Sequence, residues 1–159
     1  MKIFTIFAIG LWLGVLGFFS FAAAPALFAT LDRESAGRVV TVILPRYYAF
    51  GMVMGGLALG SVVGRAVLAQ RREVEWGSLV LTLLMLALTG YSMLVLLPQA
   101  EAARMAMRSV PAQAGMVSEA ASAFGRAHRL SVALNLLTML AGLTLVLIEG
   151  VRTRLSRRP

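Results

Sequence analysis

Long apolar runs without a charged residue alternate with short polar, mostly basic segments along this chain. At a rise of about 1.5 Å per residue, each run can cross most or all of a hydrocarbon core of roughly 30 Å. Backbone polar groups inside lipid must be satisfied within their own segment, so each run is predicted to be a helix. The four uncharged runs are Ile3–Ala24, Tyr47–Gly64, Gly77–Leu97 and Leu130–Ile148.

The pattern predicts an all-α integral membrane four-helix bundle that forms one domain over residues 1–159. The first run resembles a signal peptide, but it is long for one and Pro25 follows its small residues, so we expect it to be retained. The predicted spans are 3–24, 47–68, 77–97 and 128–149.

Two of the connections carry their own pattern. Between the first and second helices, Leu31, Val39 and Ile43 give one side of the segment an apolar character, which predicts an amphipathic segment lying in the membrane interface. Pro25 is expected to end or kink the first helix. The third connection contains strong helix formers and predicts helical extensions of helices 3 and 4, with a turn near Pro111 and Gly115.

Glycines mark the expected helix contacts, because helices in lipid associate through close backbone approach. On the first helix they predict a packing face from which Trp12 points away. The second helix carries two nearly opposite glycine faces, so it is either central in the bundle or packs against a second subunit or another membrane protein. The predicted packing residues are Gly10, Gly14, Gly17, Pro25, Gly51, Gly55, Gly56 and Gly60.

Composition narrows the class of protein. Hydrophobic residues make up 59% of the chain and charged residues 14%, and there is no cysteine, which excludes disulfides and thiolate chemistry. The net charge of +8 comes from residues at helix ends, so we expect contact with the lipid bilayer and no nucleic acid. Basic residues are densest beside the two termini, which favours cytoplasmic termini in a bacterial cytoplasmic (inner) membrane.

Polar residues inside the last span follow one helical face. His128, Ser131, Asn135 and Thr138 are spaced by three or four residues, and Asn135 must find protein or water partners for its amide. We expect the start of this helix to meet the Pro25–Tyr48 segment on the non-cytoplasmic side. The predicted binding residues are Arg38, Arg46, Tyr47, Tyr48, His128, Ser131 and Asn135.

The chain lacks motifs for hydrolysis or phosphate binding, and its four apolar runs contain no charged residue, which argues against a proton-coupled transporter. A binding or transport-associated role is therefore favoured over an enzyme, and no catalytic residue and no cofactor is predicted. One alternative is a redox or metal-resistance protein with haem or Cu(I) at His128, the single metal candidate, with methionines Met105, Met107 and Met116 as soft ligands. Another alternative is a structural subunit of a membrane complex.

Two stretches resemble a known family. They are "WLGVLGFFSFAAAPALFATLDRESAGRVVTVILPRYY", residues 12–48, and "FGRAHRLSVALN", residues 124–135. Both resemble the transmembrane-protein-205-like family, also described as domain of unknown function 4149. The resemblance implies a compact four-span protein without an established activity and, through a relative associated with platinum-drug resistance, a role in transport or trafficking. The matching positions are Phe21, Pro25, Phe28, Gly37, Arg38, Arg46, Tyr47, Tyr48, His128, Ser131 and Asn135.

Overall fold

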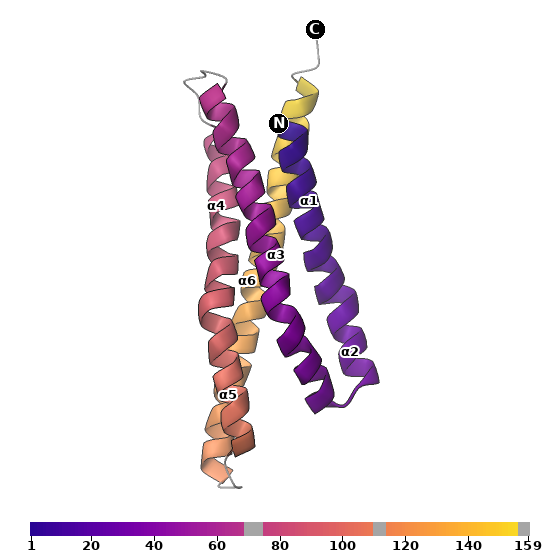
Figure 1. Ribbon diagram of the computed structural model, residues 1–159, viewed down its shortest axis with the longest axis vertical. Helices are drawn as coiled ribbons and strands as arrows, with labels where there is room; N and C mark the ends of the chain where they lie inside the picture. Colours follow the sequence, from indigo (N-terminus) through magenta and orange to yellow (C-terminus); the bar gives the residue numbers. More distant parts are fainter. Residues whose placement is uncertain (69–74, 110–113, 156–159) are drawn as a thin grey trace.

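The computed structural model describes residues 1–68, 75–109 and 114–155. In this part of the chain all regular structure is helical, and it forms four long rods (Figure 1). The helices are α1 (Lys2–Phe18), α2 (Ala24–Thr30), α3 (Arg33–Leu68), α4 (Trp76–Tyr91), α5 (Leu97–Ser109) and α6 (Ala114–Leu155), with π-helical turns η1 (Phe19–Ala23) and η2 (Ser92–Leu96).

The rods form an up-and-down bundle, which confirms the prediction of an all-α four-helix membrane fold. Both α1 and α4 pack against α3 and α6, so the four rods close into a ring. We call the end with both chain termini the terminal end, and the opposite end the hairpin end (Figure 1). The helices long and apolar enough to cross a membrane are Lys2–Thr30, Arg33–Leu68, Trp76–Met107 and Glu119–Arg154.

The predicted extensions of helices 3 and 4 are present. α5 and the start of α6 lie side by side and reach further than the α2–α3 connection at the hairpin end (Figure 1). Arg104 of α5 donates to the carbonyl of Gly37 at 2.6 Å and also to the Thr41 hydroxyl, which fixes α5 against α3. A Cβ on Gly37 would lie 3.1 Å from the Arg104 guanidinium, so glycine leaves the space this arginine uses. The expected turn at Pro111 lies outside the described residues, and Gly115 belongs to α6.

A π-helical turn lies just before a proline in two of the rods. Proline has no N–H, and its ring collides with the carbonyl four residues earlier in a regular α-helix. In η1 and η2 the bonds instead reach five residues back, from the amide of Ala24 to Phe19 and from Leu97 to Ser92. The first rod therefore continues past Pro25 to Thr30, so of the two expected effects of this proline, an end or a kink, the end is wrong.

The expected interfacial segment between helices 1 and 2 is helical, but it is not a separate element. Asp32 starts α3 by accepting from the amide of Ser35 at 2.9 Å, and the helix then runs without interruption through Pro45 to Leu68. Hydrogen bonds from the side chain and backbone of Ser35 lower the pKa of the Asp32 carboxyl below its ordinary value. With only Leu31 and Asp32 between α2 and α3, the segment forms the first turns of the second span.

The first helix packs into the core through the face opposite to the predicted one. Trp12 is buried, and its indole fills the gap above Gly51 and Gly55, where added Cβ atoms would lie 2.6 Å and 2.8 Å from it. Burying this large side chain turns the opposite side of α1 outward. At Gly10, Gly14 and Gly17 an added Cβ would meet nothing within 4 Å, so the prediction that they pack against a neighbour is wrong within this chain.

The second helix keeps one of its two predicted glycine faces inside the bundle. Gly51 and Gly55 pack as expected, whereas Gly56 and Gly60 point outward with nothing within 4 Å of an added Cβ. Pro25 is exposed. A partner at the Gly56 face stays a prediction.

Candidate functional site

A neutral polar cluster joins three rods in the hairpin half of the bundle. We call Ser20, Tyr47, Tyr48, Ser131 and Asn135 the tyrosine cluster. The Tyr47 hydroxyl donates to Asn135 Oδ1 at 3.0 Å, the Tyr48 and Ser131 hydroxyls are 3.1 Å apart, and Asn135 Nδ2 donates to Ser20 Oγ at 3.4 Å. The predicted meeting of the second helix with the polar stripe of the last helix is therefore present.

Local helix geometry explains these contacts. Consecutive residues of α3 are separated by about 100°, so Tyr47 and Tyr48 both reach toward α6, where Ser131 and Asn135 are one turn apart. The Tyr47 ring lies 5.0 Å from Phe19 and 5.1 Å from Tyr48, the latter edge to face. With their rings packed and their hydroxyls paired, these residues form a fixed junction.

Three of the predicted binding residues lie apart from the tyrosine cluster. Arg38 is exposed and donates to Glu34 and Ser35 of its own helix. Arg46 donates to the carbonyl of Val42, also on its own helix. His128 is exposed and stacks on Phe124 with ring centroids 6.3 Å apart, because α6 at this height packs against α5 instead of α3.

The metal alternative rests on His128 alone among the residues whose side chains are described. In that part of the chain no group of three or more His, Cys, Asp or Glu side chains could hold a metal ion. Met105 is exposed, and the side chain of Met116 lies outside the description. Haem or Cu(I) at His128 stays a prediction.

A groove of about 630 Å³ runs between α5 and α6 and reaches the end of α4. We call it the hairpin groove. Alanines line both of its walls and leave the two helices without bulky side chains between them. From the hairpin toward the bundle, the lining changes from Glu119 through Gln99 and Arg126 to the apolar residues Leu96 and Leu130. The alanines are Ala102, Ala103, Ala106, Ala120, Ala123 and Ala127.

Sequence reasoning missed this groove, although a signal was present. Alanine recurs at helical spacing on both α5 and the start of α6, and we interpreted the first stretch only as a good helix former. Whether two such faces meet depends on the register of the hairpin, which the apolar pattern does not fix.

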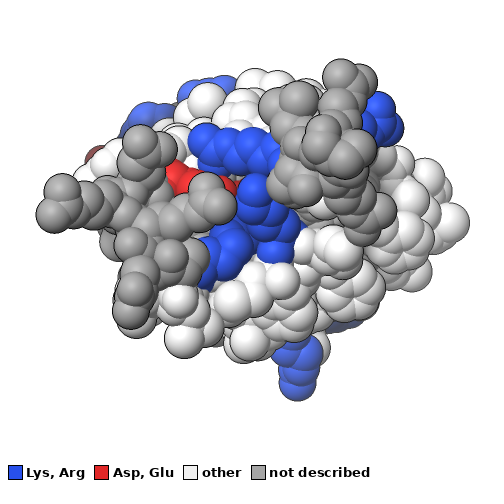
Figure 2. Space-filling view, turned by 90° about the horizontal axis from the view of Figure 1, so that it is seen from above, with Lys and Arg blue, Asp and Glu red and all other residues white. Residues whose placement is uncertain are grey.

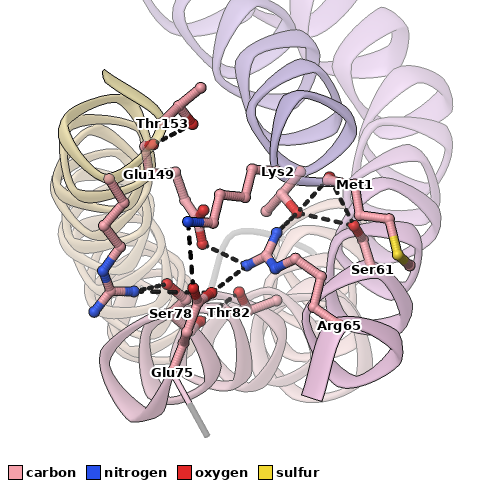
Figure 3. A network of polar contacts seen from close by, with 11 residues as sticks. Met1, Lys2, Ser61, Arg65, Glu75, Ser78, Thr82, Glu149 and Thr153 are labelled. Carbon is pink, nitrogen blue, oxygen red and sulfur yellow. Dashed lines mark hydrogen bonds and ion pairs between the residues drawn. The ribbon is translucent and has the colours of Figure 1, made fainter. Parts of the chain in front are cut away.

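A charged cluster occupies the terminal end (Figure 3). At its centre, one guanidinium nitrogen of Arg65 lies 2.6 Å from Glu75 Oε2 and 2.6 Å from Glu149 Oε1, and the other terminal nitrogen donates to Thr5 Oγ1 at 2.8 Å. The four rods each supply a residue. We call these residues the Arg65 cluster: Lys2, Thr5, Arg65, Glu75, Glu149 and Arg152.

The outer part of the Arg65 cluster surrounds Glu75. Lys2 Nζ is 3.8 Å from one of its carboxylate oxygens, and an Arg152 nitrogen is 3.9 Å from the other while donating to Ser78 at 3.0 Å. Seen from the terminal end, basic side chains gather around an acidic patch (Figure 2). The cluster carries three positive and two negative side chains.

Buried charge lies directly beyond two of the uncharged runs, inside the bundle, where we did not expect it. Glu149 is fully buried and Arg65 is nearly so. The two residues are the first charges after two of the apolar runs, and they lie within the predicted spans 47–68 and 128–149. Charges that end two runs on the same side of a bundle were the available signal.

Four long apolar helices, an internal polar junction and a charged cluster at one end define a small four-span membrane protein. A family model described as a domain of unknown function (DUF4149) matches residues 7–109, and the chain belongs to this family. An uncharacterized protein of Aquifex aeolicus (strain VF5) is 44% identical over 48 residues, which are 30% of this chain and 36% of that protein. The match thus spans about a third of the relative's length. No solved structure matches the chain significantly.

Proposed function

We propose that this protein binds an anionic amphiphile, a molecule with an acyl chain and an acidic head group, in the hairpin groove. The proposal gives the chain a binding or transport-associated role in a bacterial cytoplasmic membrane and no enzymatic step. The observation that carries it is a groove of about 630 Å³ whose lining changes from polar to apolar along its length.

The size and position of the groove support this ligand class. Small-molecule sites commonly have volumes of roughly 300–1,000 Å³. The groove crosses the level at which two apolar runs meet their polar extensions, near Leu97 and Leu130. A membrane amphiphile changes from apolar to polar over the same boundary, so its chain would lie against Leu96 and Leu130.

The charges along the groove favour an acidic head group in its middle. Arg126 is exposed there, and its guanidinium is held by the Ser122 hydroxyl at 3.2 Å. Arg129, one turn closer to the bundle, is exposed but does not line the groove. Glu119 lies at the far end beside the hairpin, where it would be separated from the head group by about two helical turns.

Filling the groove tests the proposal. Ala123→Leu places a larger side chain on its wall, and Ala121→Leu makes the same change at an exposed position of α6 that does not line it. Native mass spectrometry should count bound phosphatidylglycerol, phosphatidylcholine and palmitate on each variant. We expect Ala123→Leu to lose the bound anionic species at least tenfold and Ala121→Leu to keep it, while equal retention by both would refute the proposal.

Arg126→Gln separates the head-group contact from the acyl contact. We expect it to remove the preference for phosphatidylglycerol over phosphatidylcholine and to leave total lipid binding nearly unchanged. If the Arg126→Gln variant still prefers phosphatidylglycerol, Arg126 does not bind the head group.

The proposed orientation can be checked independently, since the chain has no cysteine of its own. Thr30→Cys at the hairpin end and Val151→Cys at the terminal end are both exposed positions. With cytoplasmic termini, a membrane-impermeant thiol reagent added outside intact cells labels only the Thr30→Cys variant. Labelling of only the Val151→Cys variant would reverse the orientation.

A further inference from the structure

The Arg65 cluster holds two buried polar atoms that its own contacts leave unused. Among the described residues, Arg65 Nε and Glu149 Oε2 are buried without a hydrogen-bond partner. Glu149 has no exposed surface at all. An ionised carboxylate in such a place is costly unless a cation compensates it.

The contacts around Arg65 have the form of a cation site built by three other rods. Thr5 of α1 accepts from one terminal nitrogen of the guanidinium. Glu75 beside α4 and Glu149 of α6 direct oxygens at the other terminal nitrogen (Figure 3). Both carboxylates contact the same nitrogen. A guanidinium suits this arrangement because it is planar, weakly hydrated and able to donate in several directions.

The two carboxylates depend on Arg65 to different degrees. Glu75 is within 4 Å of Lys2 and Arg152 as well as Arg65. Glu149 is paired with Arg65, and no other ion pair of Glu149 is found among the described residues. If the Arg65 side chain turns away, Glu75 therefore keeps two cations, whereas Glu149 is left without one until it binds a new cation or takes up a proton.

Arg65 is also placed where its side chain can leave. It lies in the last turn of α3, three residues before the helix ends at Leu68, and its guanidinium is carried on a long flexible stem. Around it, the Lys2, Glu75 and Arg152 side chains are about one third exposed, so the cluster reaches the surface of the terminal end (Figure 2).

We propose that Glu149 is the carboxylate of a binding site for a guanidinium-type monovalent cation, and that Arg65 is its resident occupant. A free cation of the same shape binds when the Arg65 side chain is withdrawn or removed. This site is separate from the hairpin groove, so it does not depend on the amphiphile proposal.

Chemical rescue of Arg65→Ala tests the site. In detergent, guanidinium at low millimolar concentration should raise the melting temperature of this variant saturably and leave the unaltered protein unchanged. Urea has the same planar shape without the charge and should have no such effect. Arg152→Ala is the matched control, because it removes an arginine that is not paired with Glu149. Guanidinium should have no effect on this variant either.

The carboxylate is tested in the same assay. In the double variant Arg65→Ala/Glu149→Gln the rescue should disappear, because the amide carries no charge. The proposal is overturned if guanidinium stabilises the single and double variants equally, if urea acts as well as guanidinium, or if sodium at the same concentration gives the same shift.

A second measurement covers the case in which Arg65→Ala fails to accumulate. Cells are then grown with guanidinium or with urea, and the variant is quantified in the membrane fraction. A severalfold higher yield with guanidinium alone supports the site, and equal yields overturn it.

Discussion

The two ends of the bundle use polar residues in opposite ways. In the hairpin half, the tyrosine cluster is neutral, and Tyr47 and Tyr48 each have a partner on α6. At the terminal end, one guanidinium serves two carboxylates, and two buried atoms of the Arg65–Glu149 pair have no partner among the described residues. Neutral pairs can be matched one to one at modest cost, whereas each charge depends on the others.

The largest difference between the ends should appear when one partner is removed. Arg65→Ala leaves the Glu149 carboxylate buried without its cation, and we expect a loss of about 3–5 kcal/mol in the free energy of unfolding. The double variant Arg65→Ala/Glu149→Gln should recover most of that loss, because it removes both charges. Denaturation in mixed micelles measures all three proteins, and a double variant as unstable as the single one would contradict the buried pair.

A substitution midway between the two ends tests the packing of the core that lies between the clusters. Gly51→Ala forces a Cβ to within 2.6 Å of the Trp12 indole, so overpacking should cost about 1–3 kcal/mol. Gly56→Ala on the outward face meets nothing within 4 Å and serves as the control. The same unfolding assay compares them, and equal stability would mean that Trp12 does not occupy the gap.

The neutral end should respond weakly. Tyr47→Phe removes the hydroxyl that donates to Asn135 and keeps the ring against Phe19, so we expect a loss of about 0.6–1.7 kcal/mol. Tyr48→Phe, at the other pair, should behave similarly. If Tyr47→Phe destabilised the protein as much as Arg65→Ala, the contrast between neutral and charged ends would fail.

The smallest effect is expected at the α2–α3 connection. The folded-state pKa of Asp32 is lowered, so its cap is fully present above the ordinary value of 3.8 and is lost as the pH falls through the lower folded value. Protonation removes the charge at the start of α3, and the amide of Ser35 should then exchange faster. Asp32→Asn keeps a good cap without a titrating group, so hydrogen exchange at Ser35 should lose this acid sensitivity.

The contact between Tyr47 and Asn135 was predictable because an amide inside an apolar run must face protein, and a tyrosine pair was the nearest polar group on another span. The face of α1 that packs inside the bundle was not predictable. Small residues show which faces permit close approach of two helices. Burying the Trp12 indole stabilises the bundle more than close approach at the three glycines would, so α1 is rotated with Trp12 inward.

The Arg65 cluster at the terminal end was not predicted, for a different reason. Hydropathy marks where an apolar run stops, and it treats the next charge as solvated. Glu149 lies in a helix that continues for six more residues, so the end of the run is not the end of the buried surface. Only the packing of four rods shows that this residue and Arg65 share one interior.

The π-helical turns also act as phase shifts in the sequence. One additional residue in a turn rotates everything beyond it by about 100° relative to an unbroken α-helix. The segments before Phe19 and after Ala23 therefore both repeat every 3.6 residues, but the positions that face inward are displaced by one residue between them. The same holds for the segments on either side of Ser92–Leu96. A single deletion inside either turn would therefore allow an unbroken α-helix that presents the same face of its outer segment to the bundle, whereas a deletion elsewhere in the rod would turn that segment by about 100°.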